Sequence, residues 1–262
     1  MARFYSLFSG SKGNASVVRS GSNSLLIDAG VSCKQIITAL EAYNISNESI
    51  SGILITHSHI DHIKGLRVLC KKLNAKVYAT EETMSTLLEC GHISDKSFGG
   101  IFCENAENIG SFSVNAFPTD HDAEGSCGFR IETPEERVCS ICTDLGHITD
   151  DVHNSVIGSD LILLESNYDP VMLKNGPYPF YLKSRIAGAD GHLSNISCAE
   201  EALRLVDKGT TRIVLGHLSQ ENNTPYLAER TVRKHIDGKY HCGTDYLLYV
   251  AGQYGLKTAV IF

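Results

Sequence analysis

The sequence predicts an α/β protein in which helices cover the outer faces of β-sheets. Short apolar runs alternate with segments of helical periodicity along most of its 262 residues. Many of the apolar runs end in a histidine or a carboxylate, and a rigid sheet commonly holds functional groups at such positions. With 42% apolar residues, the chain can bury a substantial core around these elements.

In the N-terminal half, short apolar runs separated by turns predict strands within residues 3–30, the last of which ends in Asp28. The SGSKGN segment at 9–14 is predicted to be a turn or loop between two of them. Apolar residues at helical spacing follow, and Gly91 marks the end of one helix. We predict helices at 33–43, 61–73 and 81–90, and strands at 53–55, 77–79 and within 98–117.

The C-terminal half shows a similar alternation of apolar runs with segments of helical spacing. Residues 170–181 contain prolines and tyrosines and are predicted to form a loop. One helix is expected to open with Ser197 and Glu200, which are spaced as a capping box, and another with Thr224-Pro225. Strands are predicted at 128–131, 138–142, 161–164 and 213–216, and near 246–250 and 257–261.

The most informative stretch is His57-x-His59-x-Asp61-His62, directly after the apolar run 53–55. In an extended segment His57 and His59 point the same way, while Asp61 and His62 lie at the start of the predicted helix. Imidazole and carboxylate ligands without a thiolate suit a catalytic divalent metal better than a structural zinc. A polar loop that is merely rich in histidine is the alternative, and the ligand spacing argues against it.

Other polar side chains follow the remaining apolar strands, and we consider them candidates for the same site. These are Asp28, His121, Asp144, Glu165 and His217, with His192 in a GHLSN segment. The role of His147 stays open, because it lies near Asp144 but also begins a turn. Four further histidines without such a context are expected on the surface, namely His92, His153, His235 and His241.

Composition limits the function and the compartment. The formal charge of −7 provides no general basic field, so a polyanionic substrate must be attracted locally. Nine cysteines without a framework indicate free thiols in a reducing cytosol. Cys139 and Cys142 are spaced like a redox or zinc pair, but we interpret them as core residues of a strand. No charged-then-apolar signal and no apolar run near ~20 residues is present, which predicts a cytoplasmic protein without a membrane partner.

Together these motifs resemble the metallo-β-lactamase-fold hydrolases, with a match that extends from Asp28 to His217. The SGSKGN, CTDLGH (142–147), ESNYD (165–169), GHLSN (191–195) and HLSQENNTP (217–225) segments are similar to the YycJ/WalJ type. That type is a bacterial group regarded as nucleases. The resemblance implies a four-layer αβ/βα sandwich, with residues 1–262 forming a single hydrolase domain.

The resemblance also implies roles for the individual residues. One metal would be held by His57, His59 and His121, and the other by Asp61, His62 and His217, with Asp144 bridging both. Asp28 would support the site by hydrogen bonding. Glu165 and His192 match the additional motifs of the nucleic-acid-processing branch and are, with Asp61, the predicted catalytic residues. Only 26 residues separate Glu165 from His192, so the large clamp insertion of some nucleases is absent.

The implied chemistry is hydrolysis of a phosphodiester by a metal-bound hydroxide at a dinuclear site. Zinc or manganese would serve, iron is also acceptable, and the residual positive charge favours a phosphodiester over a neutral ester. His192 is expected to protonate the leaving oxygen while Glu165 keeps the imidazole charged. The predicted substrate is nucleic acid, DNA more than RNA, cleaved by an exonuclease. Candidate substrate contacts are Asn195, Asn223, Lys12, Lys183 and Arg185.

Two other functions compete with this interpretation. A thioesterase, lactonase or cyclic-phosphate phosphodiesterase could use the same scaffold, but a thiolate leaving group hardly needs the Glu165–His192 pair. A catalytically inactive binding protein is disfavoured by the complete ligand set. The sequence leaves open the metal, DNA against RNA, the mode and polarity of cleavage, and the oligomeric state.

Overall fold

The chain folds into two seven-stranded β-sheets. The computed structural model describes residues 1–103 and 105–262. The first sheet has the strand order β14-β1-β2-β3-β4-β5-β6. Its strands β14, β1, β2 and β3 pair antiparallel, whereas β3, β4, β5 and β6 pair parallel. The bounds are β1 Arg3–Phe8, β2 Ala15–Ser20, β3 Asn23–Ile27, β4 Ile50–Leu54, β5 Val77–Ala79, β6 Phe98–Ile101 and β14 Val260–Ile261.

The second sheet has the order β13-β12-β11-β10-β9-β8-β7. Its strands β10 to β13 pair parallel and its strands β7 to β10 pair antiparallel. Strand β8 therefore points the same way as β10, β11 and β12. The bounds are β7 Glu107–Ile109, β8 Phe112–Pro118, β9 Cys127–Glu132, β10 Val138–Cys142, β11 Leu161–Glu165, β12 Arg212–Gly216 and β13 Leu247–Val250.

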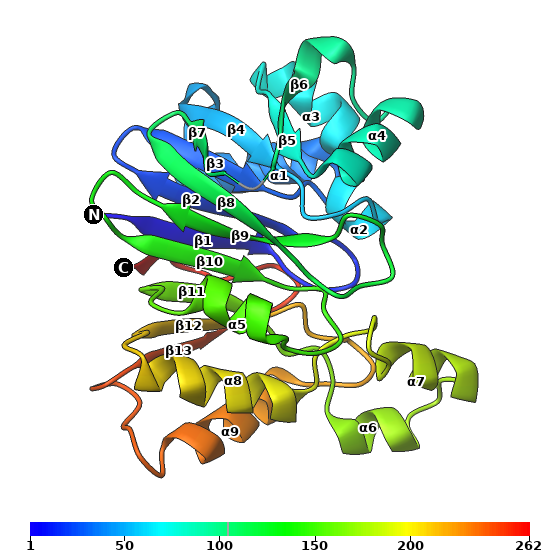
Figure 1. Ribbon diagram of the computed structural model, residues 1–262, viewed down its shortest axis with the longest axis vertical. Helices are drawn as coiled ribbons and strands as arrows, with labels where there is room; N and C mark the ends of the chain where they lie inside the picture. The colour runs from blue at the N-terminus through cyan, green and yellow to red at the C-terminus, as the bar shows by residue number, and fades with distance from the viewer. Residues whose placement is uncertain (104) are drawn as a thin grey trace.

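Helices cover the outer faces of both sheets, which gives four layers (Figure 1). Helices α1, α3 and α4 lie against the first sheet, and α5, α8 and α9 lie against the second. Their bounds are α1 Cys33–Ala42, α2 Ile60–Ile63, α3 Leu66–Leu73, α4 Glu81–Glu89, α5 Asp150–Val156, α6 Pro170–Asn175, α7 Phe180–Ile186, α8 Asn195–Asp207 and α9 Pro225–Ile236. The predicted αβ/βα sandwich is confirmed.

Three buried clusters fill the spaces between these layers, because successive strand residues face opposite sides of a sheet. Along β3, Leu25 faces the other sheet and Leu26 faces the helices. Along β11, Leu163 packs between the sheets while Ile162 packs under the helices. Both faces of each sheet are thus packed. The sheets position the loops that follow the carboxyl ends of β3, β4, β8, β10, β11 and β12.

Several element boundaries differ from the sequence prediction. The helix predicted at 61–73 is two helices, α2 and α3, separated at Lys64 and Gly65. The Gly65 amide donates to the Ala29 carbonyl, and a Cβ at this glycine would lie 2.2 Å from the Val31 carbonyl oxygen. The chain therefore bends where it must approach another backbone segment closely.

The segment 170–181 is not the predicted loop, because it contains the short helix α6 and the first two residues of α7. Asp169 caps α6 by accepting from the amides of Val171 and Met172. The cap of α8 is Ser194, whose hydroxyl accepts from the Ser197 amide at 3.1 Å, and not Ser197 as predicted. The predicted start of α9 at Thr224 and Pro225 is confirmed.

Candidate active site

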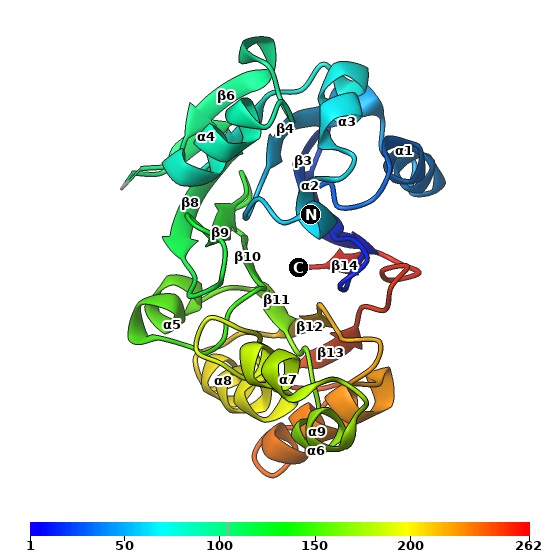
Figure 2. The same cartoon turned by 90° about the vertical axis from the view of Figure 1, so that its right-hand side faces the viewer.

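The seven predicted metal ligands lie together at one edge of the two sheets. Figure 2 looks onto this edge, where α2 lies between the sheets and α7 lies below it. Their ligand atoms form close groups in which all atoms lie within 4.8 Å of one another. One group is His57, His59 and His121, a second is Asp61, His62 and His217, and a third is His57, His62 and Asp144. Asp144 thus lies between the first two groups.

Unpartnered polar atoms in this cluster show that the donor set fits a divalent cation. His57 Nε2, His217 Nε2 and Asp144 Oδ2 are buried and make no hydrogen bond. Leaving a buried polar atom without a partner costs about 1–3 kcal/mol. A divalent cation bound by these imidazole and carboxylate atoms would satisfy them all.

Hydrogen bonds orient the rings of the first group, His57, His59 and His121. His57 Nδ1 is bonded to the Thr56 hydroxyl at 3.0 Å, which leaves its Nε2 facing the cluster. His121 Nδ1 donates to the Gly191 carbonyl at 3.1 Å, so its Nε2 faces the cluster as well. His121 Nε2 and His59 Nδ1 approach to 3.3 Å. The bonds to Thr56 and to Gly191 therefore fix which ring nitrogen His57 and His121 offer.

Asp28 supports the second group from behind. Its Oδ2 accepts from His62 Nδ1 at 2.8 Å, and its Oδ1 accepts from the Thr56 amide at 3.0 Å. Burial alone would lower the pKa of His62, but the carboxylates of Asp28, Asp144 and Asp61 raise it to about 9. A ligand imidazole must be neutral, so a cation bound at His62 Nε2 would displace a proton.

Substituting Asp28 by asparagine is expected to weaken metal binding about 10- to 100-fold, the usual effect of losing such a supporting carboxylate. Asparagine has the same shape but lacks the charge that orients His62. The measurement is a metal titration followed by calorimetry or by competition with a chromogenic chelator. Asp95→Asn, at an exposed position, is the matched control, and equal affinities for both variants would contradict the supporting role of Asp28.

Glu165 holds two histidines at once. Its Oε1 lies 2.9 Å from His192 Nδ1 and 2.7 Å from His217 Nδ1. Its Oε2 accepts from the amides of Leu145 and Leu193. The carboxylate is fully buried, and these four donors satisfy its two oxygens. Asp144 Oδ1 lies 3.2 Å from His217 Nδ1 and 3.7 Å from His192 Nδ1, which connects this group to the rest of the cluster.

The histidines of the cluster differ in the direction in which their surroundings shift the pKa of the ring. Burial, together with the nearby His62 and His121 imidazoles, lowers the pKa of His57 well below its ordinary value, so its Nε2 lone pair is free. Burial opposes the charged form of His192, yet the Glu165 carboxylate outweighs it and raises the pKa of the imidazole. Burial would raise the pKa of Glu165, but His192 and His217 lower it, so this group is ionised.

The tight packing around Asp61 depends on Gly30. The Gly30 amide donates to the Asn14 carbonyl, and the Asn14 amide donates to the Asp61 carbonyl, both at 2.8 Å. A Cβ at Gly30 would lie 1.6 Å from the Asp61 carbonyl oxygen, a distance that requires the backbone to move. The glycine is therefore part of the scaffold that holds Asp61 and His62.

We expect Gly30→Ala to lower the free energy of unfolding by roughly 3 kcal/mol, the upper end for overpacking. Urea unfolding followed by circular dichroism measures this change. Gly238→Ala is the control, because nothing lies within 4 Å of a Cβ at that position. Equal stability of the two variants would show that the segment around Gly30 adapts without cost.

Two of the predicted substrate contacts, Asn195 and Asn223, have buried side chains. Their side-chain amides bond to each other at 2.8 and 2.9 Å. Asn195 Oδ1 also accepts from the Ser166 hydroxyl. The side chains of these asparagines therefore tie the loop after β11 to the start of α8, and the helix N-termini that follow them stay predicted substrate contacts.

The three predicted cationic contacts have different surroundings. Lys12 is exposed in the loop after β1 and lines a small hollow with Lys64 and Tyr254. Lys183 Nζ donates to the Lys174 carbonyl at 2.8 Å. Arg185 Nε donates to Asp122 Oδ2 at 2.5 Å, so its charge is already paired.

Two residues of the site were missed from the sequence. Thr56, directly before His57, donates its hydroxyl hydrogen to Asp28, and the same hydroxyl oxygen lies 3.0 Å from His57 Nδ1 and 3.2 Å from His62 Nδ1. Asp122, directly after His121, places Oδ1 3.6 Å from His59 Nε2 and 3.5 Å from His121 Nε2. The only sequence signal for either residue is its position beside a motif histidine.

The remaining histidines and cysteines lie outside the cluster. His153 is not a surface residue as predicted, since its Nδ1 lies 2.6 Å from Oε1 of the buried Glu201. His92 is half-buried, His235 and His241 are exposed, and His147 is exposed beside Asp120. Cys139 packs between the sheets while Cys142 packs under the helices, so the two thiols face opposite sides of β10. All cysteines in the described ranges are free.

The fold and this cluster define a class of protein. The chain belongs to the metallo-beta-lactamase superfamily, whose family model matches residues 9–217. It is 35% identical to the exodeoxyribonuclease WalJ of Streptococcus pneumoniae over 93% of this chain and 91% of that protein. It is 34% identical to the exodeoxyribonuclease YycJ of Bacillus anthracis over 90% of this chain and 89% of that protein. The predicted YycJ/WalJ type is confirmed.

Solved structures show the same fold at low sequence identity. YhfI of Bacillus subtilis, a metallo-beta-lactamase fold protein, superposes with a TM-score of 0.72 at 15% identity and covers 97% of this chain and 98% of that chain. The short form of human tRNase Z gives a TM-score of 0.64 at 18% identity, with coverage of 100% and 99%. Within the described residues, none of the helices is both long and apolar enough to cross a membrane.

Proposed function

We propose that this chain is a dinuclear metal-dependent exonuclease acting on DNA. The observation that carries the proposal is that the Glu165–His192 pair joins the seven-residue cluster, with Glu165 Oε1 2.9 Å from His192 Nδ1 and 2.7 Å from His217 Nδ1. The chain is a metal-dependent hydrolase of phosphodiester bonds, as its superfamily and the names of its relatives indicate. That both named relatives are exodeoxyribonucleases supports DNA as the substrate and an exonuclease mode.

The metal ligands we propose are those grouped in the cluster. His57, His59 and His121 would hold one ion, Asp61, His62 and His217 the other, and Asp144 would serve both. Two divalent ions, zinc or manganese, would supply Lewis acidity and positive charge for the attack of water on phosphorus. Asp28 and Thr56 keep His62 and His57 in the orientation that binding requires.

The proton for the leaving oxygen comes from His192 in this proposal. Burial opposes the charged ring, but Glu165 binds its Nδ1 and raises its pKa, which favours the charged form, and Nε2 is the atom that donates. The His192 side chain is 20% exposed, which lets a substrate reach it while the buried Glu165 stays shielded from water. Residues 1–262 act as one hydrolase domain in this proposal, without a clamp insertion.

The experiment is incubation of the protein, reconstituted with zinc or manganese, with end-labelled DNA and end-labelled RNA. We expect metal-dependent release of nucleotides from a DNA end, with RNA cleaved more slowly and Asp144→Ala as the inactive control. Bis-p-nitrophenyl phosphate and a thioester are tested in parallel. Turnover of the thioester without any turnover of the diesters would overturn the proposal in favour of a small-molecule hydrolase.

A further inference from the structure

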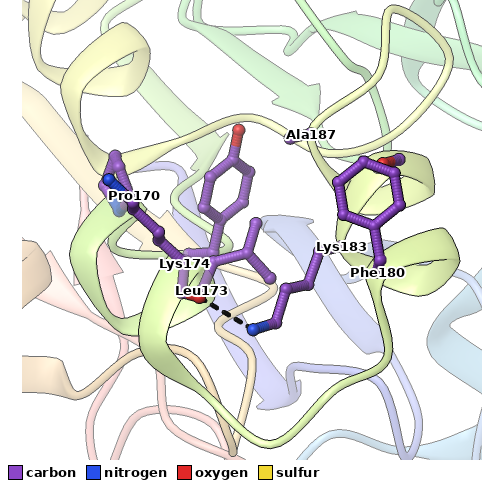
Figure 3. Close-up of a pocket in the computed structure, with 8 residues that line it drawn as sticks. Pro170, Leu173, Lys174, Phe180, Lys183 and Ala187 are labelled. Carbon is purple, nitrogen blue, oxygen red and sulfur yellow. Dashed lines mark hydrogen bonds between the residues drawn. The ribbon is translucent and has the colours of Figure 1, made fainter.

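Helices α6 and α7 line an open cavity of about 470 Å³ on the segment between Glu165 and His192. Figure 3 shows the side chains of the two helices on opposite sides of this cavity, with Pro170, Leu173 and Lys174 across from Phe180. Its wall is mostly apolar, and two ammonium groups lie at its edge. The residues that matter for the inference are Tyr168, Leu173, Lys174, Phe180, Lys183 and Ala187.

The cavity is surrounded by apolar side chains that water reaches freely. Phe180 is 85% exposed, Tyr181 is 74% exposed and Val171 is 65% exposed. Exposed apolar side chains that are grouped in this way mark a surface that binds something. A cavity of this volume lies in the range of small-molecule pockets, so a flat ring such as a nucleobase fits it.

The charge of the segment indicates what kind of ligand it attracts. Residues 170–187 contain Lys174, Lys183 and Arg185 and no carboxylate, although the whole chain has a formal charge of −7. Lys174 is exposed, and Lys183 is fixed beside it by its bond to the Lys174 carbonyl. Local positive charge next to exposed aromatic rings is the combination that binds single-stranded nucleic acid.

The residues that line the cavity belong to the stretch of chain between Glu165 and His192. Tyr168 follows Glu165 by three residues, and the His192 amide donates to the carbonyl of Ile186, the last residue of α7, at 2.9 Å. The Arg185–Asp122 pair ties α7 to the loop that carries His121. A strand whose phosphate lies at the cluster would therefore pass the cavity with its neighbouring nucleotide.

We propose that the cavity between α6 and α7 binds an unpaired base of the DNA strand, next to the phosphate that is cleaved. Phe180 stacks on the base, and the ammonium groups of Lys174 and Lys183 contact the flanking phosphates. This inference rests on the proposed function and adds a requirement for a strand end with an unpaired base. The charge of Arg185 is paired with Asp122, but the ammonium groups of Lys174 and Lys183 face no carboxylate within residues 170–187, which favours a polyanion over a protein partner.

The chain has no tryptophan, so Phe180→Trp gives a single reporter at the cavity. We expect the fluorescence of this variant, loaded with metal, to be quenched saturably by a short single-stranded DNA whose phosphorothioate linkages resist cleavage. A strand of the same length without bases should leave the signal unchanged. Phe98→Trp on β6, where the native side chain is 37% exposed, is the control and should not be quenched.

A second variant tests the energetics. Phe180→Ala is expected to weaken binding of the same phosphorothioate strand about tenfold, in line with the loss of one stacked base. Binding of the strand without bases should not change. Because Phe180 is largely exposed, this substitution should leave the fold intact, which thermal unfolding checks.

The possible outcomes separate the two proposals. Absence of quenching at position 180, or equal affinity of Phe180→Ala and the unmodified protein, would overturn the base pocket and leave the surface to another occupant such as a protein. Quenching and the tenfold loss would support the pocket even if no DNA were cleaved, in which case only the proposed function would fail.

Discussion

Asp144→Asn is expected to lower the rate of DNA hydrolysis by roughly 10⁴-fold or more, because several kcal/mol of stabilisation are lost at about 1.4 kcal/mol per tenfold. Asp144 Oδ2 is buried without a partner and lies 3.4 Å from His62 Nε2. Its Oδ1 lies 3.2 Å from His217 Nδ1 and 3.9 Å from His121 Nε2. This carboxylate is thus the group that both proposed metal sites share.

Asparagine is the sharper substitution at this position, because Asp144 has a φ of 61° in the left-handed region. Asparagine adopts this conformation more readily than alanine, so the backbone is retained and only the charge is removed. Metal content by mass spectrometry is expected to fall together with the rate. Asp120→Asn, a half-exposed neighbour of His147, is the control with near-normal values. Full metal content and full activity in Asp144→Asn would refute the dinuclear site.

His192→Ala is expected to lower turnover of DNA about 10²- to 10⁴-fold, the usual range for a general acid, without loss of metal. The ring is oriented by the hydrogen bond between its Nδ1 and Glu165, whose carboxylate raises the pKa of His192 and so favours the charged form. A p-nitrophenolate leaving group needs no proton, so turnover of bis-p-nitrophenyl phosphate should fall much less than turnover of DNA.

The alternative for His192 is a ligand role, since its ring also groups with Asp144, Glu165 and His217 at ligand distance. Metal analysis separates the two roles, because a ligand variant would lose one ion and an acid variant would keep both. His235→Ala, at an exposed position of α9, is the control and should match the unmodified protein in rate and metal content.

Much of the secondary structure could be predicted because it depends on neighbours in the chain. The spacing of Ile36 and Leu40 located α1, and the Thr224-Pro225 order located the start of α9. Such features reflect hydrogen bonds and burial within one turn or one strand. The break at Gly65 was missed because its cause lies in the segment 29–31, which packs against it only in the folded chain.

The candidate site likewise has one part that the local sequence determined and another part that depends on the tertiary structure. The sequence by itself determined the His57–His62 motif, since four ligands within six residues share one strand end and one helix start. Only the tertiary structure brought His121, Asp144 and His217 to that motif, and only it showed one Glu165 oxygen serving both His192 and His217. It also buried Asn195 against Asn223 and gathered Phe180 and Lys174 around a cavity. The reason is physical: contacts between distant segments depend on how the two sheets pack, which no local pattern of residues encodes.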